Sequence, residues 1–366
     1  MIFDKRLYKE FNGGMVIAMI SIMVLGLLTI YSATQSRLMP FNESFVARQV
    51  SWMLIGLGLA MVIINISYQK FIDIAYILYV INIILLILVL ILGHIRLGAQ
   101  RWFSIGGFAF QPSEFLKINL IVALAGYIGS KKDTMNRLAS LFVPILLLAV
   151  PFILVLLQPD LGTALLLVPI FFTLLIVGGA DFKYIFIMLF LGFASMPLFW
   201  HFLRDYQKQR LLVFINPNAD PLGAGYTIIQ SKIAAGSGGL FGKGWLAGTQ
   251  NQLNFLPERH TDFIFSVIGE EWGYIGALIL ILLYLFIIKK AFDIASSTSD
   301  MYGKLIANGI GVMLGLQIVI NIGMTIGLMP VVGIPLPLVS YGGSSLVSTV
   351  IAIALLLNIS MRRSRF

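Results

Sequence analysis

Residues 305–361 read LIANGIGVMLGLQIVINIGMTIGLMPVVGIPLPLVSYGGSSLVSTVIAIALLLNISM, a stretch without a single Asp, Glu, Lys or Arg. A helix needs roughly 20 apolar residues to cross the ~30 Å hydrocarbon core of a bilayer. The stretch is long enough for two such helices, joined by a connection at 329–345 that contains Pro330, Pro335 and Pro337. Because irregular backbone at membrane depth must be buried in protein or face a cavity, the connection is predicted to be a re-entrant loop.

The rest of the chain has the same character. Of its 366 residues, 59% are hydrophobic and 11% are charged, against about 25% charged in soluble domains. Its apolar runs are too long and uniform for the strands of a membrane barrel. We therefore expect an all-α integral membrane protein, a single polytopic membrane domain over residues 1–366. Ten spans are predicted, at 14–33, 48–66, 74–93, 112–130, 139–157, 161–178, 184–202, 263–288, 304–328 and 342–361.

Lys and Arg predict the orientation, because short cytoplasmic loops are enriched in them. With the N-terminus inside, the inner segments hold Lys5, Arg6, Lys9, Lys70, Lys131, Lys132, Arg137, Lys183, Lys289, Lys290, Lys304, Arg362, Arg363 and Arg365. The short outer segments hold fewer, namely Arg37, Arg48, Arg96, Arg101 and Lys117. Both termini are therefore predicted to be cytoplasmic. The net charge of +9 is attributed to cytoplasmic loops and not to nucleic-acid binding.

This orientation makes residues 203–262 one large extracytoplasmic loop. Within it, Tyr226–Ala235 has apolar residues at helical spacing and is predicted to be a short helix along the membrane interface. The glycine-rich stretch 236–248 lacks the spacing of a Walker A loop and is interpreted as flexible. The chain has no cysteine, so a Cys-based metal site is excluded. Its three histidines form no HExxH pair.

Asp262 is the sharpest catalytic candidate, because it lies where the outer loop meets a span, beside Glu258, Arg259 and His260. A carboxylate at the mouth of a membrane protein can be partly desolvated, which raises its pKa and suits it to act as a general base. The alternative is a structural one, in which Thr261 or Asp262 is the N-cap of the following helix. The two interpretations are compatible.

Charged residues inside spans are expensive and indicate function. Glu114 and Lys117 are three residues apart, so they share a helical face in the fourth span. They form either an ion pair of their own or a pair with Asp160, and either arrangement is compatible with a polar cavity that opens outward. Glu270 and Glu271, about two turns into the eighth span, are interpreted as near the interface, with a carboxylate facing a protein cavity.

Arg48, Arg101 and Arg210 fall at the outer face, where short loops are normally poor in Arg. Guanidinium groups bind diphosphates bidentately. Each could instead be an interfacial residue whose stem lies along apolar surface. We keep both interpretations open.

Several motifs in one order carry a resemblance to a known family. They are GAQRWF (98–103), FQPSEFLK (110–117), QPDLGT (158–163), DPLGAGYTIIQSKIAAGSGGLFGKGWLAGTQ (220–250), LPERHTDFIF (256–265) and PLPLVSYGGSS (335–345). The chain resembles the SEDS family (shape, elongation, division and sporulation) over nearly its whole length. Within it, Arg259 before the HTDF motif and KGWLAGTQ favour the branch that acts in cell elongation.

The resemblance implies a peptidoglycan glycosyltransferase of the bacterial cytoplasmic membrane that polymerises lipid II for cell elongation and rod shape. It implies a class B penicillin-binding protein transpeptidase and other elongation-complex membrane proteins as partners, with membrane lipid around them. It assigns Asp262 as the catalytic residue. It also implies that Lys117 and Asp160 pair in a polar cavity.

On this basis Asp262 is expected to take the proton from the acceptor sugar in an inverting transfer, by analogy with inverting glycosidases. A divalent cation, Mg²⁺ or Mn²⁺, is a possible cofactor that the sequence does not demonstrate. The remaining alternatives are a lipid II flippase and a non-catalytic scaffold for a transpeptidase. Substrate or diphosphate binding is predicted for Arg48, Arg101, Ser113, Glu114, Lys117, Asp160, Arg210, Arg259 and His260.

Overall fold

The structure, a computed structural model, describes residues 10–35, 44–96, 99–105, 108–217, 220–221 and 223–362. Six residues of the orientation argument lie outside these ranges, namely Lys5, Arg6, Lys9, Arg37, Arg363 and Arg365.

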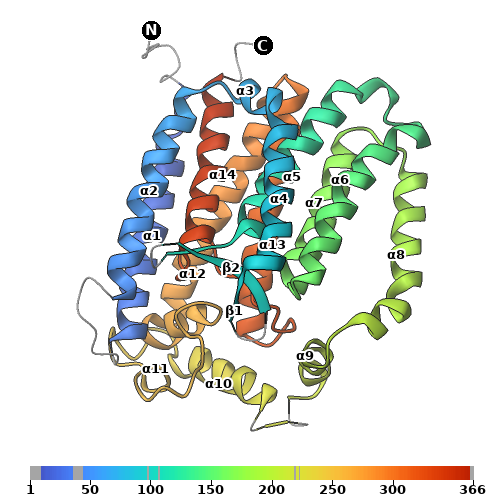
Figure 1. Cartoon of the computed structure of the whole chain (residues 1–366). Helices are drawn as coiled ribbons and strands as arrows, with labels where there is room; N and C mark the ends of the chain where they lie inside the picture. The colour runs from blue at the N-terminus through green and yellow to red at the C-terminus, as the bar shows by residue number, and fades with distance from the viewer. Residues whose placement is uncertain are drawn as a thin grey trace.

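A long helix occupies each of the ten predicted spans (Figure 1). These helices are α1 (Gly13–Thr34), α2 (Phe45–Asn65), α4 (Ala75–Leu92), α5 (Pro112–Ser130), α6 (Leu138–Leu157), α7 (Leu161–Val177), α8 (Phe182–Phe202), α12 (Ile264–Ser297), α13 (Met301–Thr325) and α14 (Gly343–Arg362). Among the described residues, eight helices are long and apolar enough to cross a membrane. The two others are α7, which has 17 residues, and α5, which carries Glu114 and Lys117. The count of ten spans stays a prediction.

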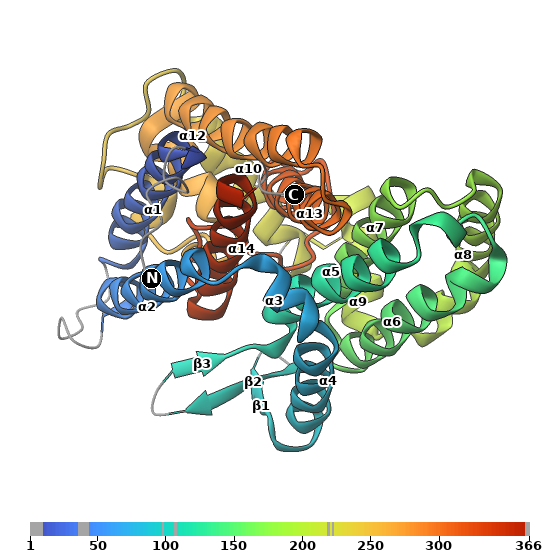
Figure 2. The same ribbon diagram turned by 90° about the horizontal axis from the view of Figure 1, so that it is seen from above.

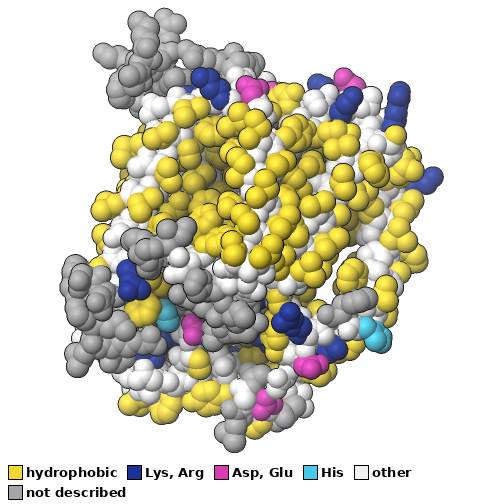
Figure 3. All heavy atoms as spheres, viewed as in Figure 1, with side chains coloured by type: hydrophobic (Ala, Val, Ile, Leu, Met, Phe, Trp, Pro, Cys, Tyr) yellow, Lys and Arg dark blue, Asp and Glu magenta, His cyan; other side chains and the backbone are white. Residues whose placement is uncertain are grey.

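The sides of the bundle form a broad hydrophobic band, and charged side chains gather towards its two ends (Figure 3). The start of α1 and the end of α14 lie at one end of the bundle, and α9 (Asp205–Ile215), α10 (Ala224–Ser237) and α11 (Thr249–Gln252) lie at the other (Figure 1). This separation agrees with a multi-pass membrane protein whose long loop faces away from its termini.

Helix α14 is the centre of the packing, since it contacts α2, α5, α12 and α13 (Figure 2). In an apolar stretch of 18 residues of α14, 94% of the residues are buried, whereas in the corresponding stretch of α8 only 6% are buried. Figures 1 and 2 both show α8 standing apart from the other long helices. Because protein covers so little of α8, its apolar side chains are suited to face lipid.

Shorter elements complete the described chain. They are α3 (Tyr68–Asp73), the 3₁₀ turn Lys132–Thr134, and the strands β1 (His94–Arg96), β2 (Ala99–Ile105) and β3 (Phe108–Phe110). The strands form an antiparallel sheet in the order β1-β2-β3, with Trp102 opposite His94 and Phe103 opposite Phe110. The sheet is a local departure from the predicted all-α fold. Its two outer strands have three residues each, too few for alternation to stand out in the sequence.

In the long loop, the predicted helix at Tyr226–Ala235 is confirmed as α10, whereas α9 was not predicted. The interpretation of 236–248 as flexible is wrong, because this glycine-rich segment docks on α12. Gly273, with φ 66° and ψ −163°, interrupts α12 and leaves backbone groups on either side without helical partners.

Loop backbone supplies those partners. Lys243 N–H donates to the carbonyl of Glu270 (3.0 Å), and Tyr274 N–H donates to the carbonyl of Gly239 (2.9 Å). Gly242 permits the close approach, because a Cβ there would lie 2.1 Å from the carbonyl oxygen of Glu271. The loop therefore replaces part of the hydrogen-bond ladder that the kink removes.

Candidate functional site

Asp262 lies in a run of turns just before α12, and its carboxylate is free of hydrogen bonds to the described residues. Helix α12 has Phe263 as its N-cap residue and no side-chain cap. The interpretation of Thr261 or Asp262 as a capping residue is therefore wrong. The Thr261 hydroxyl instead donates to the carbonyl of Glu258 (3.1 Å) within the same turn. Asp262 itself is half-buried.

The backbone of this turn is fixed by neighbouring elements. The Asn321 amide on α13 donates to the carbonyl of Asp262 (3.0 Å). Ser340 Oγ donates to the carbonyl of Thr261 (2.6 Å), and Tyr341 N–H donates to the carbonyl of His260 (2.9 Å). Residues 326–342, between α13 and α14, thus hold the motif in place, which is the role a buried re-entrant segment can fill.

Arg259 and His260 also connect the motif to other helices. Arg259 is buried, and its Nε donates to the carbonyl of Ala33 at the end of α1 (2.7 Å). The His260 ring lies 4.7 Å from that of Phe45 and 5.8 Å from that of Tyr341, measured between centroids. These contacts give both residues a packing role, and their predicted contact with substrate stays a prediction.

A second polar group forms where β2 meets the start of α7. Asp160 is the N-cap of α7, and its Oδ1 accepts from the Thr163 N–H (3.2 Å). Arg101 Nη1 lies 3.6 Å from Asp160 Oδ1, and Arg101 Nε donates to the carbonyl of Gln158 (3.0 Å). Arg101 also donates from Nη2 to the carbonyl of Pro159. The guanidinium is thus held in place by three acceptors.

A pocket with about 320 Å³ of open space lies between these groups and α9. Its lining comes from four parts of the chain, namely Arg101, Pro159, Leu161, Tyr206, Gln207, Arg210, Leu211, Pro330, Val331 and Val332. Tyr206 Oη donates to the carbonyl of Pro159 (3.0 Å), and Arg210 Nη1 donates to the carbonyl of Val331 (3.3 Å). Both arginines therefore converge on one pocket, as the diphosphate hypothesis requires.

Asp262 is not part of the pocket lining, but it lies near enough for the charges of the lining residues Arg210 and Arg101 to act on its carboxylate. Its Oδ2 lies 3.5 Å from the position that a Cβ on Gly333 would take, next to the lining residue Val332. Burial raises the pKa of Asp262 from 3.8 to about 6; Arg210 and Arg101 oppose the rise in pKa, and Glu258 and Asp160 add to it. A carboxylate with this pKa is ionised at neutral pH yet basic enough to accept a proton.

Lys117 and Asp160 do not pair, so that expectation from the resemblance is wrong. Lys117 Nζ lies 2.9 Å from Glu114 Oε2, and both side chains are buried. The spacing of three residues on one helix favours this pair, while Asp160 is taken by Arg101. Gln111, just before α5, joins the start of that helix to Asp160, since its Nε2 donates to Ser113 Oγ (3.0 Å) and to Asp160 Oδ2 (3.4 Å).

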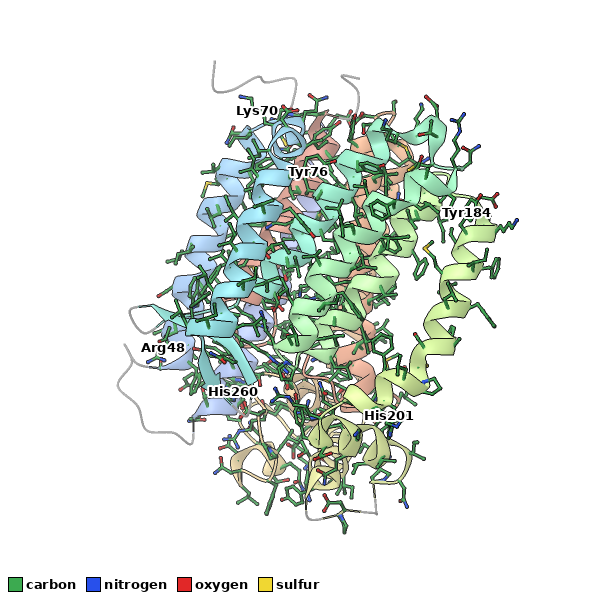
Figure 4. The ribbon with its side chains drawn as sticks, turned by 45° about the vertical axis from the view of Figure 1, so that its right-hand side comes forward. Arg48, Lys70, Tyr76, Tyr184, His201 and His260 are labelled. Carbon is green, nitrogen blue, oxygen red and sulfur yellow. The ribbon has the colours of Figure 1, made fainter. Side chains whose placement is uncertain are left out.

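Arg48 is exposed on α2 and does not line the pocket. Figure 4 shows Arg48, His201 and His260 towards one end of the bundle, with Lys70, Tyr76 and Tyr184 towards the other. The structure therefore brings Arg48 to the correct end but not to the pocket, and its role in diphosphate binding stays a prediction.

Glu270 and Glu271 are fully buried and hold the long loop. Glu270 accepts from Lys243 Nζ (2.8 Å) and from the Gln250 N–H (3.0 Å). Glu271 accepts from Asn251 Nδ2 (3.2 Å) and from Ser32 Oγ. Their partners are loop and α1 groups, so the interpretation of a carboxylate facing a cavity does not describe them.

Sequence reasoning missed Asn321, Gln111 and Tyr206, which all contact the site. Asn321 lies inside the charge-free run 305–361. A polar residue in an apolar run was the one feature of the sequence that could have indicated it, because a buried amide group needs hydrogen-bond partners. Tyr206 lies on α9, a helix that was not predicted.

Known proteins resemble the chain over nearly its full length. A family model described as a cell cycle protein, FtsW, RodA and SpoVE, matches residues 14–365. The chain is 41% identical over 356 residues to the peptidoglycan glycosyltransferase MrdB of Escherichia coli K12, covering 95% of this chain and 93% of that one.

Solved structures agree with the sequence relatives. The rod shape determining protein RodA of Thermus thermophilus is 32% identical with a TM-score of 0.72, covering 96% of this chain and 97% of that one. A chain from the structure of a peptidoglycan synthase complex is 35% identical with a TM-score of 0.83, covering 97% and 99%.

Proposed function

Because the chain belongs to the FtsW, RodA and SpoVE family of cell cycle proteins and is a peptidoglycan glycosyltransferase, we propose that Asp262 is the general base of its transfer reaction. The observation that carries the proposal is the Asp262 carboxylate itself. It is half-buried, accepts no hydrogen bond from the described residues, has a pKa of about 6 and lies within the electrostatic reach of Arg210 and Arg101, two arginines that line the pocket. A carboxylate with only a structural role would be engaged by a cap or an ion pair.

The substrate is lipid II, a disaccharide-peptide joined through a diphosphate to a polyprenyl chain. The acceptor's 4-hydroxyl oxygen attacks the anomeric carbon of the donor sugar, and its proton passes to Asp262. The bond from that carbon to the diphosphate oxygen breaks, and the polyprenyl diphosphate leaves with the electron pair. One displacement inverts the anomeric centre from α to β, so base and leaving group lie on opposite faces of the sugar.

Arg101 and Arg210 are placed to stabilise the departing diphosphate. Arg101 is fixed by Asp160 and by two carbonyls, whereas Arg210 is exposed and donates to the carbonyl of Val331 at the pocket. A guanidinium held before the reaction needs no reorganisation when charge develops on the leaving group. Arg101 therefore serves as the fixed part of the anion site, and Arg210 can adjust to the substrate.

Asp160 lies beside Arg101 at this anion site, and a Mg²⁺ or Mn²⁺ ion is the cofactor that the site can take. Such ions commonly bind one or two carboxylates together with substrate phosphates. Within the described ranges no three His, Asp or Glu side chains form a ready-made metal group. The ion would therefore bind chiefly with its substrate, to neutralise the diphosphate.

The cellular setting is proposed from the relatives. The chain works in the bacterial cytoplasmic membrane with both termini inside, where it serves cell elongation. Its partner is a class B penicillin-binding protein transpeptidase, in keeping with the similar chain from a peptidoglycan synthase complex. The lipid tail of the substrate stays in the bilayer while its sugar reaches Asp262.

The test compares the purified wild-type chain with Asp262→Asn, each reconstituted with its transpeptidase partner and supplied with fluorescent lipid II. The variant should form glycan about 10²–10⁴ times more slowly, the usual contribution of a general base. Polymer at the wild-type rate would refute the assignment and favour a scaffold. Headgroup translocation in liposomes without polymer would favour a flippase.

A further inference from the structure

The direction of the Asp262 carboxylate depends on its own backbone. No donor among the described residues bonds its oxygens, and the side chain has only two rotatable bonds between the backbone and the carboxylate oxygens. A base must lie within hydrogen-bond reach of the proton that it removes. Any contact that holds the Asp262 backbone in place therefore also limits where the carboxylate of the base can lie.

Asn321 makes that contact from α13. The residue is fully buried, and its Nδ2 donates to two carbonyls, that of Asp262 (3.0 Å) and that of Ile334 (2.8 Å). Ile334 follows Gly333, the residue beside the Asp262 carboxylate. One amide group therefore sets the spacing between the catalytic turn and the segment that lines the pocket.

The position of Asn321 is costly, which supports a specific role. It lies in the uncharged apolar stretch of α13, and its Oδ1 has no partner among the described residues. A buried amide with an unsatisfied oxygen carries a desolvation cost that an apolar residue would avoid. The amide is thus placed for its two donor hydrogens.

Ser340, near the end of the segment 326–342, makes a second contact with the catalytic turn. Its hydroxyl accepts from the Leu336 N–H (2.8 Å) and donates to the carbonyl of Thr261 (2.6 Å). Asn321 and Ser340 therefore bind successive carbonyls of the catalytic turn, one from each side of the re-entrant segment.

We propose that Asn321 is a positioning residue for the transfer reaction, which ties the Asp262 backbone to Ile334, in the segment whose residues Pro330–Val332 line the pocket, with Ser340 as its auxiliary. The inference rests on the proposed role of Asp262 as the base. Misplacing a catalytic group by about 1 Å can cost on the order of 100-fold in rate. Loss of Asn321 acts on kcat, because the arginines that bind the diphosphate are untouched.

The chain offers a matched control in Asn358 on α14. It is also fully buried, and its Nδ2 donates to the carbonyls of Ile63 (2.5 Å) and Ile66. Asn358 joins α14 to the end of α2, at the opposite end of α2 from Phe45, which packs on His260. Asn321→Leu and Asn358→Leu each keep the number and branching of the side-chain heavy atoms but strand buried carbonyls, so both lower Tm.

The experiment measures kcat and KM for fluorescent lipid II polymerisation by both variants with the partner present. Asn321→Leu should lose about 10–100-fold in kcat with KM within about twofold, and Asn358→Leu should keep both constants. Wild-type kcat in Asn321→Leu, or equal losses in the two variants, overturns the proposal. If Asn321→Leu does not accumulate in membranes, Ser340→Ala decides by the same measurement, with unchanged kcat counting against the proposal.

Asp262→Asn is run alongside. If it stays active, the proposed base is wrong and the positioning role falls with it. If it is inactive while Asn321→Leu is fully active, only the positioning role fails.

Discussion

Asp262→Asn should make the protein more stable above about pH 6 while it removes activity. The wild-type carboxylate is half-buried and has no hydrogen-bond partner among the described residues, so its charged form is destabilised in the folded protein. Asn has nearly the same shape and carries no charge. The substitution therefore relieves a cost that the folded state bears only when the carboxylate is ionised.

The magnitude follows from the pKa of Asp262, which is raised from 3.8 to about 6. Each unit of pKa corresponds to about 1.4 kcal/mol, so the full shift gives about 3 kcal/mol at most. Residual exposure of the side chain reduces this to about 1–2 kcal/mol. Between these two pKa values the folded state holds a proton that the unfolded state has lost. Stability is therefore greatest below pH 4 and declines as pH rises through about 6.

The assay is thermal unfolding of both proteins in one detergent from pH 4 to pH 8. The Tm difference, variant minus wild type, should be smallest at pH 4 and rise by a few degrees to a plateau above pH 7. A Tm difference for Asp262→Asn that is constant over this range would refute the reasoning.

Three further perturbations test other parts of the structure. Gly242→Ala should lower Tm, because its Cβ would lie 2.1 Å from a backbone carbonyl of α12 and its φ is 82°. Gly236→Ala, with open space at its Cβ, should leave Tm unchanged. Equal Tm values for the two variants would count against docking of the loop on α12. Lys117→Ala should cost about 3–5 kcal/mol by stranding a buried carboxylate, and the double variant with Glu114→Gln should recover much of the lost Tm; no recovery would argue against this pair. Arg101→Lys should raise the KM for lipid II nearly as much as Arg101→Ala, because one ammonium group cannot reproduce three guanidinium contacts. A wild-type KM in Arg101→Lys would contradict the idea that these three contacts fix the guanidinium for substrate binding.

The sequence could predict those parts of the fold that follow from the distribution of apolar residues along the chain. The ten long helices follow from apolar runs, since a run of that length has few alternatives in lipid. The small sheet and α9 did not follow, because strands of three residues and a helix of 11 residues leave weak periodic signals.

The candidate site shows the same division. Asp262, Arg101 and Arg210 were found because charge is conspicuous in an apolar chain. Both arginines line one pocket, and their charges act on Asp262. The residues alone left the partner of Lys117 open between Glu114 and Asp160, because the distance between helices cannot be read from the sequence. The family resemblance implied Asp160, whereas the structure pairs Lys117 with Glu114. Asn321 was missed because an uncharged amide in a span does not indicate which carbonyls it meets.

The kink at Gly273 also has a consequence for the order in which the protein is made. Loop residues 239–244 leave the ribosome before residues 270–275, to which their backbone is bonded. During synthesis, the loop must therefore remain undocked until its complement in α12 has emerged. The first half of α12 then reaches its final form only when an earlier segment folds back onto a later one. The kinked part of α12 and the loop that docks on it are thus completed together.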